Sequence, residues 1–123
     1  EEKDTVFIAG AGPVGLMALL GLKAMGVKRI FQSDISPVRR EKARELGATL
    51  VLDPSTEKIP PKMKELTAGR GVDKAIEAVG IEATLKDCLA SVRYQGTVIV
   101  QGIFTERVPV QAPCSREGRI SGT

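Results

Sequence analysis

The residues best suited to chemistry in this sequence are three closely spaced glycines in the run Gly10-Ala11-Gly12-Pro13-Val14-Gly15, which has the pattern G-x-G-x-x-G. Such a pattern alone is a weak signal. Here an apolar stretch precedes the run, a helical pattern follows it, and Asp34 closes the next apolar stretch. Together these features are typical of a segment that binds the pyrophosphate and ribose of a dinucleotide.

Each position of the run has a mechanical role in that interpretation. Gly10 permits a tight turn out of a strand, and Gly12 carries no side chain that would keep a pyrophosphate from the backbone. Gly15 lets the following helix pack closely on the sheet. Pro13 is tolerated at the first helical position because an N–H there would be unpaired. The phosphates would meet free N–H groups and the positive end of the helix dipole.

Asp34 favours NAD over NADP as the dinucleotide. A carboxylate at the end of the second strand accepts both hydroxyls of the adenosine ribose and repels a 2′-phosphate. The alternative is that Asp34 only makes a turn before Ser36-Pro37. Arg39 is expected to lie over the ribose or adenine, and Arg40 to be a solvated charge on the next helix. Because a nearby arginine can bind a 2′-phosphate, NADP is the less favoured alternative.

Apolar runs alternate with helical patterns along most of the chain. The pattern predicts strands over about residues 5–9, 29–33, 49–52, 72–78 and 97–100, and a short sixth strand at 119–121. Helices are predicted over about 13–25, 37–46, 60–67 and 82–92. This alternation requires right-handed crossovers and predicts a doubly wound parallel α/β sheet, the Rossmann fold, with strand order 3-2-1-4-5-6. Residues 1–123 are interpreted as one domain.

Composition excludes several classes of function. The 123 residues, 42% of them apolar, suffice for one core, and histidine is absent, which removes histidine catalysis and imidazole metal ligands. The separated Cys88 and Cys114 make no zinc site and indicate a reduced, cytoplasmic protein. A net charge of +3 and four aromatic residues argue against nucleic acid, and no apolar run is long enough to cross a membrane.

No catalytic residue and no metal ligand is assigned. Glu77, inside the fourth predicted strand, is expected to be structural, and Cys88 to pack as a small apolar residue. Tyr94 lacks a lysine four positions later, so the Tyr-x-x-x-Lys pair of short-chain dehydrogenases is missing.

Taken in order, several stretches resemble the cofactor domain of the zinc-dependent medium-chain alcohol and polyol dehydrogenases. Gly102-Ile103-Phe104 is similar to the butanediol and sorbitol dehydrogenase branch of that family. The other matching stretches, which with it cover essentially the whole chain, are Gly10 to Leu16, Ser33-Asp34-Ile35-Ser36 with Arg39, Glu45 to Ala48, Gly71-Val72-Asp73, Glu77 to Gly80, and Gly96-Thr97-Val98.

The resemblance implies further cofactor contacts beyond the glycine run, Asp34, Ile35 and Arg39. Ala78, Val79 and Gly80 would wall the adenosine side. The backbone at Gln101, Gly102 and Ile103 would contact the nicotinamide, with Val14 behind the ring and Ile120 completing that pocket. The sixth strand of the family typically pairs with its mate, so a homodimer through that strand is expected.

The resemblance also implies the function. The chain is expected to be an NAD-binding domain cut from a longer dehydrogenase, positioning nicotinamide for hydride transfer from a secondary alcohol or diol. Zinc would belong only to the missing catalytic domain, so the chain alone would be inactive. The alternative is a stand-alone dinucleotide-binding or sensing module. A methyltransferase is disfavoured because Ile8-Ala9 precedes the glycines where that class carries an acidic residue.

Overall fold

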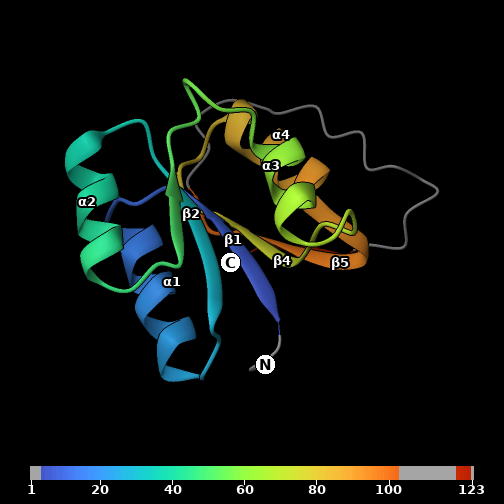
Figure 1. Ribbon diagram of the computed structural model, residues 1–123, viewed down its shortest axis with the longest axis horizontal. Helices are drawn as coiled ribbons and strands as arrows, with labels where there is room; N and C mark the ends of the chain where they lie inside the picture. The colour runs from blue at the N-terminus through green and yellow to red at the C-terminus, as the bar shows by residue number, and fades with distance from the viewer. Residues whose placement is uncertain (1–3, 103–118, 123) are drawn as a thin grey trace.

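The computed structural model describes residues 4–102 and the backbone of residues 119–122 (Figure 1). Its strands form one parallel six-stranded sheet in the order β3-β2-β1-β4-β5-β6. This confirms the predicted fold and strand order. The strands are β1 (Thr5–Ala9), β2 (Arg29–Ser33), β3 (Leu50–Leu52), β4 (Val72–Glu77), β5 (Val92–Val100) and β6 (Arg119–Gly122).

Among the described residues, four helices cover the two faces of the sheet. They are α1 (Pro13–Ala24), α2 (Pro37–Glu45), α3 (Ile59–Leu66) and α4 (Glu82–Ser91). Figure 1 shows α1 and α2 on one side of the sheet and α3 and α4 on the other. On one face, Ile8 and Ile30 of the sheet pack with Leu19 of α1 and Ala43 of α2. On the other face, the sheet packs with α3 and α4 through a second cluster, whose largest buried members include Phe7, Phe31, Ile59, Met63 and Leu85. Buried strands with helices on both faces explain the apolar runs in the sequence.

The helix boundaries follow the predicted local signals closely. Pro37 opens α2, and the Ser36 hydroxyl caps it by accepting the Arg39 N–H at 3.3 Å. Gly26 follows the end of α1 with a φ of +89°, a backbone conformation that glycine adopts without strain. Cys88 is fully buried in α4, which confirms the expectation that it packs as an apolar residue. Burial and the nearby charge of Glu77 raise the pKa of the Cys88 thiol well above its ordinary value.

The start of β5 was predicted wrongly. The strand begins at Val92, directly after α4, rather than at Thr97. Val72 pairs with Val92, whereas Lys74 pairs with Thr97, so β5 carries extra residues in a bulge where Gln95 has a φ of +62°. Because the residues of this bulge are mostly polar, the pattern of apolar residues does not indicate that the strand begins here.

Asp73 joins three strands at the amino end of the sheet. Its carboxylate accepts the Thr5 N–H at 2.7 Å and the Thr5 hydroxyl at 3.0 Å, and it pairs with Arg93 of β5. Burial opposes ionisation, but these bonds from Thr5 and Arg93 leave the pKa of Asp73 below its ordinary value of 3.8. The bonds therefore stabilise the folded chain at every pH at which the carboxyl group is ionised.

This carboxylate predicts part of the acid sensitivity of the chain. Because its folded pKa is lowered, its stabilising effect is complete above about pH 3.8 and is lost as pH falls through the lowered pKa. In Asp73→Asn, the free energy of unfolding should be smaller at pH 7 and should fall less steeply below pH 4. Urea denaturation at a series of pH values measures both quantities. Glu45→Gln, an exposed carboxylate on α2, is the control and should follow the parent curve; an Asp73→Asn curve parallel to the parent would contradict the account.

Candidate functional site

The carboxyl ends of β1, β2 and β4 meet at one edge of the sheet, where the strand order reverses. In open α/β sheets this switch point is where ligands bind. A cavity of about 290 Å³ lies there. It is lined by Gly10, Gly12, Pro13, Val14, Ser33, Asp34, Ile35, Arg39, Pro54, Ala78, Val79, Ile81 and Thr84. Nine of these were predicted as cofactor contacts from sequence, whereas Ser33, Pro54, Ile81 and Thr84 were missed.

The glycine run makes the turn between β1 and α1. Gly10 has a φ of +113°, and a Cβ atom there would lie 2.7 Å from Val79 Cγ2. A Cβ atom on Gly15 would lie only 2.1 Å from the Gly10 carbonyl oxygen. Gly15 therefore allows α1 to start close against the turn, and it lies outside the cavity lining.

Gly12 differs from its two neighbouring glycines. It has an ordinary φ of −76°, and a Cβ atom there would meet only the Arg39 guanidinium, at 3.4 Å from Nη1. No side chain caps the amino end of α1 at this position. Backbone N–H groups at an uncapped helix start attract anions. The absence of a side chain at Gly12 thus leaves open space in front of the start of α1.

The Gln32 side chain holds the glycine turn between β1 and α1, and it was not predicted to be part of the site. This side chain is fully buried in β2, and its Nε2 donates a hydrogen bond to the Gly10 carbonyl oxygen at 2.8 Å. The Gly10 N–H donates to the carbonyl oxygen of Ser33 at 2.7 Å. The only sequence signal was a polar residue directly after the apolar pair Ile30-Phe31.

Asp34 lines the cavity and also anchors two turns. Its side chain is 8% exposed. One carboxylate oxygen accepts the Ala11 N–H at 2.9 Å, and the other accepts the Ser36 N–H at 2.8 Å. A carboxylate oxygen has two lone-pair sites, so each can accept one further hydrogen bond. The turn role and a ligand role are therefore compatible at this residue.

The two arginines of α2 have different surroundings. The Arg39 side chain is 57% exposed, and its Nη1 lies 3.9 Å from the Asp34 carboxylate at the cavity. The prediction that Arg40 is a solvated charge is wrong. Its side chain is 19% exposed, and Nη1 donates to the carbonyl oxygens of Asp34 at 2.9 Å and Ile35 at 3.0 Å. Arg40 lies one helical turn after Ser36, which brings its side chain back over the turn where α2 begins.

Glu77 holds the turn after β4, which forms the wall of the cavity at Val79. It is fully buried at the end of β4, and Oε2 accepts the Val79 N–H at 3.1 Å, the Gly80 N–H at 2.8 Å and the Thr84 hydroxyl. This confirms the expectation that Glu77 is structural. A Cβ atom on Gly102 would lie 2.4 Å from both Glu77 Oε1 and the Gly80 nitrogen, so Gly80 and Gly102 pack against this turn rather than lining the cavity.

A second hollow, of about 520 Å³, adjoins the first at Pro13 and Val14 and reaches Gln101. Met17 and Ala18 of α1 complete its lining. Val14 and Gln101, both predicted to lie beside the nicotinamide, line the same hollow. Ile103 lies outside the described residues, and Ile120 is placed by its backbone alone, opposite Val98 in the β5–β6 pair.

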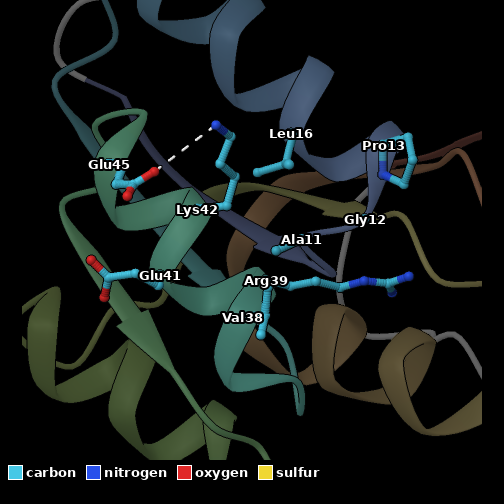
Figure 2. Close-up of a pocket in the computed structure, with 9 residues that line it drawn as sticks. All are labelled: Ala11, Gly12, Pro13, Leu16, Val38, Arg39, Glu41, Lys42 and Glu45. Carbon is cyan, nitrogen blue, oxygen red and sulfur yellow. Dashed lines mark ion pairs between the residues drawn. The ribbon is translucent and has the colours of Figure 1, made fainter.

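A third hollow, of about 500 Å³, lies between α1 and α2, where Figure 2 shows Arg39 at one end and Leu16 on the α1 side. Its remaining charged residues are Glu41, Lys42 and Glu45, with Lys42 Nζ 3.9 Å from the Glu45 carboxylate. Positive and negative side chains alternate there, so the hollow has no consistent charge for an anion or a cation.

The described part of the chain holds neither a metal-binding cluster nor a membrane-spanning helix. Within residues 4–102, no three Cys, Asp or Glu side chains are close enough together to hold a metal ion, so the residues described do not fit a zinc site. The same part of the chain contains no helix long and apolar enough to cross a membrane.

Comparisons with known proteins agree with this geometry. The family model described as zinc-binding dehydrogenase matches residues 13–123. Sorbitol dehydrogenase of Bacillus subtilis (strain 168) is 37% identical over 118 residues, which is 95% of this chain and 33% of that protein. The chain thus spans about a third of the length of this curated relative.

Solved structures give the same result. The crystal structure of 2R,3R-butanediol dehydrogenase from Bacillus subtilis matches with a TM-score of 0.91 and 31% identity, over 98% of this chain and 35% of that one. A protein described as a zinc-binding dehydrogenase, from Sinorhizobium meliloti 1021 and bound to NADP, matches with a TM-score of 0.89 and 28% identity, over 98% and 37% of the two chains.

The predicted resemblance is therefore confirmed by sequence and by fold. The chain belongs to the zinc-binding dehydrogenase family, and its relatives include the sorbitol and butanediol dehydrogenases.

Proposed function

We propose that this chain is the NAD-binding domain of an alcohol or polyol dehydrogenase. In the whole enzyme it would position the nicotinamide for hydride transfer from a secondary alcohol or diol. The observation that supports this most directly is the cavity at the switch point of the sheet. It is lined by the glycine turn after β1, by the Asp34 carboxylate after β2 and by the turn at Val79 after β4. Three different strand ends therefore contribute to it.

The lining suggests how each part of the dinucleotide would be held. The ribose hydroxyls of adenosine would donate to the Asp34 oxygens, which keep lone pairs for them. Ile35 and Val79 offer exposed apolar surface to the adenine from opposite walls. The pyrophosphate would lie over Gly12 at the start of α1. The nicotinamide would then extend past Val14 into the second hollow, beside Gln101.

The surroundings of Asp34 support NAD rather than NADP. A 2′-phosphate would meet a carboxylate that is almost fully buried. Arg40 is already bonded to two carbonyl oxygens and lies 3.4 Å from the Asp53 carboxylate, so Arg39 is the better-placed cation for a 2′-phosphate. The solved relative from Sinorhizobium meliloti is bound to NADP, so the preference of this chain has to be measured directly.

The chemical step requires more than this chain. The chain spans about a third of the length of its curated relative, and its described residues offer no metal site. We propose that zinc and the alcohol are bound by other parts of a longer cytoplasmic enzyme, so that residues 1–123 alone bind the dinucleotide and catalyse nothing. The edge position of β6 supports a homodimer formed by pairing of this strand with its copy.

The first prediction concerns cofactor preference. The chain should bind NAD at least about 10-fold more tightly than NADP, because one charge-assisted hydrogen bond contributes about 1.5–3 kcal/mol. Asp34→Gly should lose most of that preference. Isothermal titration with each dinucleotide measures it, and Glu41→Gln, which removes an exposed carboxylate from the same region of α2, should leave it unchanged. Equal or tighter binding of NADP by the parent chain would contradict the role of Asp34.

The second prediction separates the glycines. Gly12→Ala should fold normally, because its backbone conformation is ordinary and its surroundings are open, yet its methyl group should weaken NAD binding about 10-fold or more. Gly15→Ala should instead destabilise the fold, because its Cβ would overlap the Gly10 carbonyl.

The matched control is Gly21→Ala, the same substitution on α1 where no atom lies within 4 Å of the new Cβ. It should stabilise the chain by about 0.5–1 kcal/mol and keep NAD affinity. Thermal denaturation and calorimetric titration of the three variants provide the measurements. An unchanged affinity in a folded Gly12→Ala would show that the pyrophosphate does not approach this turn.

A further inference from the structure

Arg40 joins two loops that are far apart in the sequence. Its Nη1 donates to the carbonyl oxygens of Asp34 at 2.9 Å and Ile35 at 3.0 Å, in the turn between β2 and α2. The same nitrogen lies 3.4 Å from Asp53 Oδ2, in the loop after β3. The side chains of Arg40 and Asp53 are 19% and 22% exposed, so this ion pair is less screened by solvent than the exposed pairs along α2.

The loop held by Asp53 is well defined. Asp53 Oδ1 accepts the Ser55 N–H at 2.9 Å and the Ser55 hydroxyl at 2.6 Å, which closes a tight turn around Pro54. The Ser55 hydroxyl and N–H, and then the charge of Arg40, lower the pKa of the Asp53 carboxyl, so it is ionised at neutral pH. Pro54 is the residue of this loop that lines the 290 Å³ cavity, together with Asp34 and Ile35.

We propose that Arg40 and Asp53 are positioning residues for the adenosine end of the dinucleotide site. Their ion pair holds Pro54 as a wall of the cavity, and the hydrogen bonds from Arg40 fix the carbonyl groups of the turn that presents Asp34 and Ile35. The ligand concerned is the AMP portion of the cofactor. This inference rests on the proposed function, because it assigns that portion to the cavity.

The test uses AMP as the probe, measured by calorimetric titration of the parent chain, Arg40→Leu, Asp53→Asn and the double variant. Each single variant should bind AMP about 5-fold more weakly, the scale of one partly buried ion pair. The double variant should bind about as weakly as Arg40→Leu alone, since the Asp53 carboxylate acts on the site through its ion pair with Arg40. Lys42→Leu, which removes a cation from the same helix outside the 290 Å³ cavity, should keep the parent affinity.

A merely structural loss is separated by a second control. Thr67 is buried near the amino end of β4, where its hydroxyl donates to the Met63 carbonyl and accepts the Gly71 N–H at 2.8 Å. Thr67→Val should therefore lower the melting temperature while AMP affinity stays at the parent value. In Arg40→Leu, the amide NMR signals of Ser36 and Ser55 should both move, because their N–H groups lie in the two loops that Arg40 joins.

The binding results separate the positioning role of Arg40 and Asp53 from the proposed function on which it rests. Failure of the parent chain to bind AMP or NAD would contradict the proposed function and, with it, this inference. If the parent binds AMP, then parent-like affinity in both single variants, or additive losses in the double variant, would overturn the positioning role alone. An Arg40→Leu loss matched by Thr67→Val would overturn it as well.

Discussion

The site depends on how the last two residues of β2 and the residue that follows them hold the turn after β1. Gln32 donates from its side chain to the Gly10 carbonyl, the Ser33 carbonyl accepts the Gly10 N–H, and the Asp34 carboxylate accepts the Ala11 N–H, at 2.7–2.9 Å. Buried polar groups are costly without partners. The turn cannot shift without breaking several of these bonds, so its backbone is fixed before any ligand arrives.

Two further turns are fixed in the same manner around this one. Glu77 holds the turn after β4 through the N–H groups of Val79 and Gly80, and Arg40 holds the turn after β2 through two carbonyl oxygens. The cavity therefore lies between three turns whose backbone groups are each held by a side chain from the sheet or from α2. What is left to face a ligand is the start of α1, the remaining lone pairs of Asp34 and the apolar wall at Val79. A preformed arrangement of this kind lowers the ordering cost of binding.

Sequence alone predicted the strand order, the helices and most of the cavity lining, because alternating apolar runs and the glycine pattern are local signals. It missed Gln32, whose role depends on a neighbouring strand, and Pro54, which reaches the cavity from a distant loop. It misjudged Arg40 because a helical arginine was assumed to point into solvent, whereas the carbonyl oxygens of Asp34 and Ile35 and the Asp53 carboxylate lie within its reach. Such contacts are set by tertiary packing, which no local pattern encodes.

We propose above all that this cavity holds the adenosine ribose of a dinucleotide through Asp34. A crystal structure of the chain with NAD tests it most directly. We expect the two ribose hydroxyls at hydrogen-bond distance, about 2.5–3.0 Å, from the Asp34 carboxylate, with the pyrophosphate over Gly12. A dinucleotide bound in the hollow between α1 and α2 instead, or with its ribose turned away from Asp34, would contradict it.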